Sequence, residues 1–285
     1  MREPKYYTGN IKGIFDTHAH LYDERYGEEG TFSRDLLVRA AEYGVTRILV
    51  PADSVESSKA AISYVRENQG VSSVKLYASV GIHPHEASSY DEAARDFIVD
   101  ALSSTNRTVT NVMALGEIGL DYHYDLSPRD VQRAVFCAQL DIAYEMDVPF
   151  ILHEREATGD CMDILREYKR EKRLRELPGV CHCCSTSPEI AEEMVKMGFY
   201  IGFDGPITFK SNKNGPEVCR RIPLERIVIE TDCPYLTPEP NRGLTNEPCY
   251  IPFVADKIAA IKEISVEEVV RTTSDNGCIL YGIKD

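Results

Sequence analysis

VMALGEIGLDYH, at residues 112–123, joins a short apolar run to a group of polar side chains. The run 112–117 is rich in aliphatic residues and does not alternate with polar ones, which is typical of a β-strand buried on both faces. Glu117 stands at its carboxyl end, and Asp121 and His123 follow within six residues. The stretch therefore predicts a core strand that presents ionisable groups at one edge of a sheet.

Seven further runs of this kind occur, at residues 13–16, 47–51, 76–81, 149–153, 179–182, 199–202 and 227–231. Helical patterns alternate with them, at residues 31–44, 55–69, 91–104, 127–147, 158–175 and 187–197, with two more between 249 and 281. Ser127 and Ser187 are predicted N-caps, each followed by a proline at the first helical position. Eight strands alternating with helices predict an α/β fold, a (β/α)8 TIM barrel, as a single domain over residues 1–285. An open doubly wound sheet is the alternative.

All seven histidines of the chain follow the carboxyl ends of predicted strands: His18, His20, His83, His85, His123, His153 and His182. In a barrel, every strand ends at the same mouth, where the active sites of this fold lie. In an open sheet, the same residues would spread along an edge. The placement of the histidines therefore favours the barrel.

His18 and His20 are two residues apart in a predicted extended segment, so their side chains point the same way. Two converging imidazoles suit a divalent transition ion. His153, His182 and Asp232 supply further nitrogen and oxygen donors from other strands, and the two oxygens of Glu117 can bridge a pair of ions about 3.5–4 Å apart. Any one of these residues alone is more often an ordinary hydrogen-bonded side chain, but all six fall at predicted strand ends. The sequence thus predicts a site for two divalent ions, with Zn, Mn, Ni, Fe or Mg all compatible with the donors.

A second group of polar residues is predicted to line the substrate side of this site: His83, His85, Asp121, His123, Arg155 and Arg242. The histidines are candidates to meet a phosphate or carboxylate, and either arginine could hold an anion in a bidentate fork. The alternative for each is a structural role, as a loop hydrogen bond or an ion pair.

Charge and composition exclude some classes of protein. The formal charge of −14 argues against binding a polyanion through a broad basic face, although metal ions can supply local positive charge. The chain has no tryptophan and no basic-aromatic stripe of the kind that single-strand binders use. No run of about 18 apolar residues predicts a membrane span, and no apolar leader is visible, so a cytoplasmic monomer is expected. Nine irregularly spaced cysteines indicate reduced thiols, and the spacing at residues 181–184 does not fit a closed structural zinc site.

Six stretches resemble the TatD-type metal-dependent hydrolases, which are described as DNases and belong to the amidohydrolase-like barrels. They are FDTHAHL at 15–21, GIHPH at 81–85, GEIGLDYH at 116–123, VPFILHERE at 148–156, ITFK at 207–210 and ETDCPYLTPEPNRGLTNEP at 230–248. The resemblance implies a TIM barrel of the metal-dependent hydrolase type with a binuclear site held by His18, His20, Glu117, His153, His182 and Asp232. It also implies hydrolysis of a phosphodiester, in DNA from the 3′ end or in a small phosphoester. Cys184 and Thr186 depart from the usual Phe and Gly of the family, which puts the substrate pocket in question.

The expected mechanism gives Glu117 and Asp232 the catalytic roles. Glu117 bridges the ions, and Asp232 accepts the proton of the attacking water as general base. An amide, lactone or aminoacyl-ester hydrolase on the same barrel is the main alternative. Many such enzymes bridge their metals with a modified lysine at strand four, and no lysine occurs in residues 112–124. A non-catalytic metal-binding protein is a further alternative. It is disfavoured because loss of catalysis would be expected to remove some of the six donor residues, and all six are present.

Overall fold

The computed structural model describes residues 3–27 and 31–284. Within this part of the chain, eight parallel strands form one sheet in consecutive order, from β1 to β8. Their bounds are β1 (Ile14–Asp16), β2 (Val45–Val50), β3 (Lys75–Val80), β4 (Val112–Asp121), β5 (Phe150–Arg155), β6 (Gly179–Cys181), β7 (Tyr200–Phe203) and β8 (Ile227–Ile229). All eight overlap the predicted runs, although β4 continues beyond Glu117 to Asp121. The consecutive order excludes the doubly wound alternative, in which the strand order reverses.

The sheet closes on itself just beyond the ends of β1 and β8. Ala19 and Cys233 form a parallel bridge. The Asp232 amide donates to the His18 carbonyl at 2.9 Å, and the Thr17 amide donates to the Ile229 carbonyl at 3.1 Å. The Asp16 carboxylate strengthens the junction, because its oxygens accept from the Thr231 amide at 3.0 Å and the Thr231 hydroxyl at 2.7 Å. The barrel is therefore closed by the same segments that carry His18 and Asp232.

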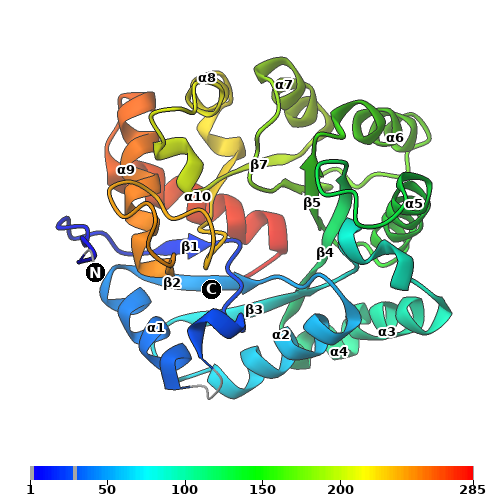
Figure 1. Ribbon diagram of the computed structural model, residues 1–285, viewed down its shortest axis with the longest axis horizontal. Helices are drawn as coiled ribbons and strands as arrows, with labels where there is room; N and C mark the ends of the chain where they lie inside the picture. The colour runs from blue at the N-terminus through cyan, green and yellow to red at the C-terminus, as the bar shows by residue number, and fades with distance from the viewer. Residues whose placement is uncertain (1–2, 28–30, 285) are drawn as a thin grey trace.

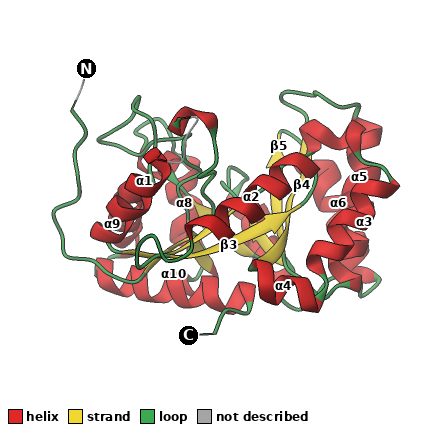
Figure 2. Cartoon of the chain, turned by 90° about the horizontal axis from the view of Figure 1, so that it is seen from below, coloured by secondary structure: helices red, strands yellow, loops and turns green. Residues whose placement is uncertain are grey.

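Helices surround the strands in the ring expected of this fold (Figures 1 and 2). Their bounds are α1 (Thr31–Glu42), α2 (Val55–Asn68), α3 (Glu92–Leu102), α4 (Ser104–Thr110), α5 (Arg129–Glu145), α6 (Thr158–Arg170), α7 (Pro188–Met197), α8 (Asn214–Arg221), α9 (Ile251–Lys262) and α10 (Val266–Tyr281). The Ser187 side chain caps α7 as predicted, accepting from the Ile190 amide. No described helix is long and apolar enough to cross a membrane.

Two helix predictions were wrong in detail, and two short helices were not predicted. Ser127 does not cap α5, since its hydroxyl donates to the His85 carbonyl and thereby holds the loop after β3. The segment predicted at 158–175 stops at Arg170. The short helices α4 and α8 were missed, because α4 has no buried residue and α8 buries only three small or medium side chains.

One buried side chain from each strand fills the inside of the barrel: Phe15, Leu49, Tyr77, Ala114, Ile151, Val180, Tyr200 and Val228. Leu280 and Tyr281 at the end of α10 join this cluster. Because side chains of a strand alternate between its faces, positions two and four residues further along also point inward. This register places His153 two residues after Ile151 and His182 two after Val180. Asp232 lies beyond the end of β8 with a φ of 53°, and its amide bond to the His18 carbonyl holds its backbone at the mouth.

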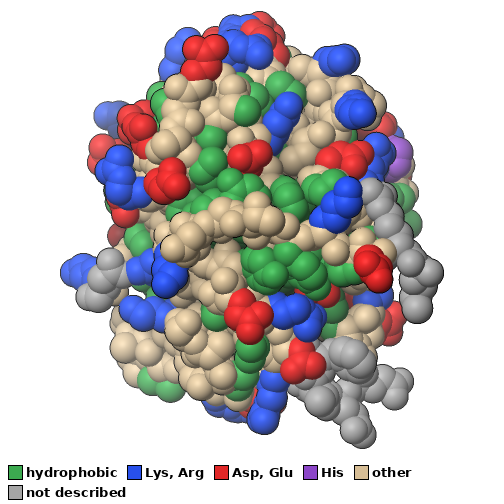
Figure 3. Space-filling model, turned by 90° about the vertical axis from the view of Figure 1, so that its left-hand side faces the viewer, with side chains coloured by type: hydrophobic (Ala, Val, Ile, Leu, Met, Phe, Trp, Pro, Cys, Tyr) green, Lys and Arg blue, Asp and Glu red, His purple; other side chains and the backbone are tan. Residues whose placement is uncertain are grey.

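On the face at the left of Figure 1, Lys and Arg side chains are interspersed with Asp and Glu (Figure 3). No broad basic area covers this face, in agreement with the net charge of −14.

Candidate metal centre

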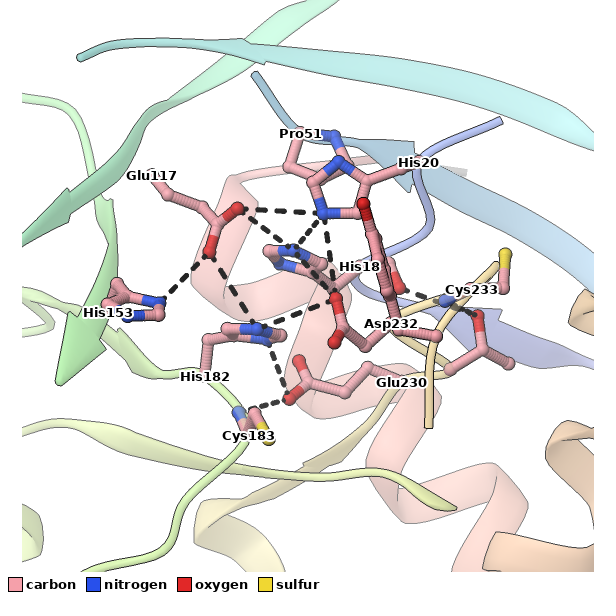
Figure 4. A network of polar contacts seen from close by, with 12 residues as sticks. His18, His20, Pro51, Glu117, His153, His182, Cys183, Glu230, Asp232 and Cys233 are labelled. Atoms are coloured by element: carbon pink, nitrogen blue, oxygen red, sulfur yellow. Dashed lines mark hydrogen bonds and ion pairs between the residues drawn. The ribbon is translucent and has the colours of Figure 1, made fainter. Parts of the chain in front are cut away.

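The six predicted metal ligands converge at the carboxyl-terminal mouth of the barrel (Figure 4). They come from five strands or the residues directly after them. His18 and His20 follow β1, Glu117 belongs to β4, His153 to β5, His182 follows β6, and Asp232 follows β8. Gly119 allows β4 to approach β5, because a Cβ atom at this position, where φ is +145°, would lie 1.9 Å from the His153 carbonyl oxygen.

Glu117 lies between two sets of donors. Its Oε2 is 3.5 Å from His18 Nε2 and 3.6 Å from His20 Nε2. Its Oε1 is 3.6 Å from His153 Nδ1 and 3.7 Å from His182 Nε2. The two carboxylate oxygens therefore face different groups of nitrogen atoms.

Asp232 completes the first of these sets. Its Oδ1 lies 3.5 Å from His20 Nε2, 3.7 Å from His18 Nε2 and 3.8 Å from His182 Nε2. His18 Nε2 and His20 Nε2 are themselves 3.2 Å apart.

These separations fit donors to a shared cation. Around an ion with bonds of 2.0–2.1 Å and tetrahedral geometry, neighbouring ligand atoms lie about 3.3 Å apart. Most of the nitrogen–oxygen distances are longer than direct hydrogen bonds, and imidazole with carboxylate is a donor set typical of Zn, Mn, Ni or Fe. The residues present thus fit divalent metal ions.

Two further carboxylates orient the histidines. Glu230 Oε1 accepts from His182 Nδ1 at 3.0 Å and from the Cys183 amide at 2.6 Å. Asp121 Oδ2 accepts from His153 Nε2 at 3.1 Å. Each bond holds a proton on the nitrogen that faces the carboxylate, so the other ring nitrogen lies on the side of Glu117 and would offer its lone pair there when a cation is bound. Sequence analysis missed the role of Glu230, although a charged residue that ends a buried apolar run is a signal for it.

The pKa shifts follow from burial among opposite charges. Burial raises the pKa of Glu117, but His18 and His153 outweigh this effect and hold it well below its usual range. The Asp232 carboxyl shows the same balance, with His20 lowering its pKa. Burial lowers the pKa of His182, but Glu230 outweighs it and raises the value to about 10. The carboxylates of Glu117 and Asp232 therefore stay ionised at neutral pH, and the ionised form is the one that binds cations.

His83 lies closer to the centre than its assignment to the substrate side implies. It is buried, and it groups with Glu117 and His153 as a possible cation-binding set. Its Nδ1 accepts from the His85 amide at 3.1 Å, so the neutral ring carries its proton on Nε2. Burial, aided by His153, lowers the pKa of His83 well below its usual value. In this tautomer His83 is a hydrogen-bond donor and not a ligand through Nε2.

The other predicted substrate residues are spread around the mouth. Asp121 is fully buried, and its Oδ2 also accepts from His85 Nε2 at 2.9 Å. His123 is exposed and its Nδ1 lies 2.7 Å from Glu156 Oε1, and among the described residues it belongs to none of the possible cation-binding groups. The guanidinium of Arg155 stacks over Tyr124 at 4.8 Å, and that of Arg242 over Phe209 at 4.2 Å.

A pocket of about 390 Å³ adjoins the centre, and His153, His182 and Asp232 contribute to its lining. Arg155, Cys184 and Asp204 also line it. Cys184 is buried, and all nine cysteines are free thiols. Asp204, at the end of β7, was not predicted. It is 3% exposed, its Oδ2 has no hydrogen-bond partner among the described residues, and burial raises its pKa well above the usual range.

Replacing Glu230 by alanine is expected to weaken metal binding about 10- to 100-fold, the effect typical of losing the hydrogen-bond partner of a ligating histidine. His182 Nδ1 and the Cys183 amide would both lose their acceptor. Calorimetric titration of the metal-free protein with Zn²⁺ measures the change. Glu230→Gln keeps an acceptor oxygen at the same place and should retain most of the affinity. Equal losses in the two variants would contradict the orienting role.

Several known proteins are similar to this chain in sequence or in fold. The chain matches the model of the TatD-related DNase family over residues 15–282. YabD, a metal-dependent hydrolase of Bacillus subtilis, is 40% identical over 270 residues, which cover 95% of this chain and 99% of YabD. The deoxyribonuclease Tat-D of Schizosaccharomyces pombe is 31% identical over 293 residues, covering 90% of this chain and 89% of the relative. The crystal structure of YjjV, a TatD homologue from Escherichia coli K12, matches with a TM-score of 0.81 at 28% identity, covering 95% of this chain and 98% of that one. The chain therefore belongs to the TatD-related DNase family of metal-dependent hydrolases.

Proposed function

We propose that this protein hydrolyses phosphodiester bonds of DNA at a centre of two divalent ions held by His18, His20, Glu117, His153, His182 and Asp232. The observation that supports two ions is the position of Glu117, whose two oxygens face separate sets of histidine nitrogens. When bound, such ions polarise phosphoryl oxygens and lower the pKa of water towards neutrality.

The side chains of the centre and of the adjoining pocket have separate roles in the proposed reaction. Asp232 Oδ1 faces the donors of the first set and is ionised, so it can accept the proton of the attacking water. His83 Nε2–H can donate to a phosphoryl oxygen as negative charge grows there. Arg155, which lines the adjoining pocket, can meet a second phosphate oxygen. Asp121 positions His153 and His85 and makes no substrate contact in this scheme.

Two observations favour a phosphodiester over an amide or lactone as substrate. Glu117 occupies the strand-four position where many amide hydrolases carry a modified lysine, and residues 112–124 contain no lysine. The S. pombe relative bears the name deoxyribonuclease. The donor set does not choose among Zn, Mn, Ni, Fe and Mg, so the metal is part of the test.

The experiment compares substrate classes with each metal in turn. Protein loaded with one metal at a time is incubated with a 5′-labelled single-stranded DNA, a dinucleoside phosphate, a lactone and an aminoacyl ester. We expect cleavage of both phosphodiesters, with the labelled strand shortened stepwise from its 3′ end. Asp232→Asn, which keeps the size but lacks the basic carboxylate, should lose this activity. A higher kcat/KM for the lactone or the aminoacyl ester, with both phosphodiesters intact, would overturn the proposal.

A further inference from the structure

A second cavity, of about 560 Å³, opens near the mouth of the barrel between the loop after β7, α8 and α9. The two helices lie side by side (Figure 1). Asn212 lines both this cavity and the pocket beside the metal centre. We call this second cavity the lysine groove, after Lys210, Lys213 and Lys257 in its lining. The groove and the metal pocket are therefore neighbours.

Positive charge is concentrated in the lysine groove, in contrast to the chain as a whole. Its lining contains Lys210, Lys213, Lys257 and Arg220, and one acidic residue, Glu217, which pairs with Arg220. Among residues 3–27 and 31–284, no carboxylate oxygen lies within 4.0 Å of the three lysine ammonium groups. Three cations without carboxylate partners around one concave surface favour an anionic ligand. This cluster of cations contrasts with the net charge of −14 of the whole chain.

The loop that forms the groove is held in place by its own hydrogen bonds. The Asn212 side chain accepts from the Gly215 amide at 2.8 Å and donates to the Pro206 carbonyl at 3.0 Å. The Thr208 hydroxyl accepts from the Glu239 amide at 2.8 Å. These bonds fix the backbone between the metal pocket and the lysines, so the groove exists before a ligand binds and little ordering entropy is lost on binding.

An aromatic ring accompanies the cations, a combination that the sequence analysis did not find, because Lys257 on α9 lies far along the chain from Phe209. Phe209 is half buried in the lining of the groove, and the guanidinium of Arg242 lies 4.2 Å from its ring centroid. A basic groove with an aromatic side chain is the combination that binds single-stranded nucleic acid, because cations track the phosphates and bases stack on rings. The short exposed groove does not offer the broad basic face that a duplex requires.

We propose that the lysine groove binds the phosphates of single-stranded DNA next to the nucleotide being cleaved. The inference rests on the proposed phosphodiesterase function. It assigns Lys210, Lys213 and Lys257 to strand binding, and it places the uncut strand across the β7–α8 loop. Substrates longer than a dinucleotide should therefore bind better than a dinucleotide does.

The test uses Lys213→Ala, Lys257→Ala and the double variant, with Lys75→Ala as the matched control. Lys75 is an exposed lysine at the start of β3, at the end of the barrel opposite the mouth. The first measurement is the binding of a fluorescently labelled 10-nucleotide strand by anisotropy as a function of salt. In the wild-type protein the logarithm of affinity should fall with the logarithm of salt concentration, and each lysine removed should reduce that slope by about 0.7. Lys75→Ala should keep the wild-type slope.

The second measurement compares KM for the 10-nucleotide strand with KM for a dinucleoside phosphate, whose single phosphate is the one to be cleaved and leaves none for the groove. We expect the double variant to raise KM for the longer substrate about tenfold more than for the shorter one. A wild-type protein that binds the strand with no salt dependence, or variants that change both substrates equally, would overturn the groove assignment. A wild-type protein that cleaves neither substrate would instead overturn the proposed function, and the anisotropy slopes would still decide on the groove.

Discussion

Glu117→Ala is expected to reduce kcat at least about 1,000-fold while the barrel stays folded. Glu117 faces the two sets of histidine donors with one oxygen each, so its loss removes the carboxylate that the two ions would share. Metal ions contribute several kcal/mol of transition-state stabilisation in such sites, and each 1.36 kcal/mol corresponds to a factor of ten in rate. Turnover of a dinucleoside phosphate, measured after reconstitution with saturating metal, checks the prediction.

A matched variant separates this effect from a general loss of negative charge at the mouth. Glu86 is an exposed carboxylate in the 3-10 helix directly after His83. Glu86→Ala should change kcat less than about twofold, as expected of a surface substitution. Circular dichroism and thermal unfolding of Glu117→Ala should show an intact fold, because replacing a buried carboxylate surrounded by histidines leaves the hydrophobic interior of the barrel unchanged. Wild-type turnover in metal-loaded Glu117→Ala would contradict the bridging role.

Removal of metal by a chelator is expected to abolish activity and to lower the melting temperature. An ion that binds only the folded state stabilises it by about 4 kcal/mol when its concentration is 1,000 times the dissociation constant. In a protein of this size, that corresponds to a fall in Tm of about 8–16 °C on chelation. The measurement is a thermal scan with and without chelator, paired with elemental analysis of bound metal.

Adding back single metals then tests the number and kind of ions. We expect Tm and activity to recover together and to reach a plateau at two equivalents. Recovery of full activity at one equivalent would contradict the binuclear centre. Unchanged activity in protein shown to contain less than about 0.1 ion per chain would contradict metal dependence altogether.

Much of the barrel could be predicted because its strands are buried on both faces and therefore form unbroken apolar runs. The run that ends at Glu117 and the run that ends at His153 differ in sequence, yet both have the same physical signature. Helix boundaries were less predictable. The residues that follow Ser127 predict that it is an N-cap. Its hydroxyl instead donates to the His85 carbonyl, 42 residues away, and no local sequence pattern predicts this long-range hydrogen bond. The polar helix α8 buries only Gly215, Val218 and Cys219, too little for an amphipathic pattern to be visible.

The candidate site likewise has a part that the sequence predicts and a part that it does not. The sequence by itself determined which residues reach the mouth, because each follows or ends a buried run, and strand periodicity fixes the direction of His153 and His182 once the run is known. Only the tertiary structure decided which partners each residue contacts there. Glu230 meets His182 across 48 residues, and Asp121 meets His153 across 32. Lys257 joins the groove formed by the β7–α8 loop from a helix later in the chain. Those partnerships depend on distances between separate strands and loops, which the packing of the closed barrel sets and which no local sequence pattern contains.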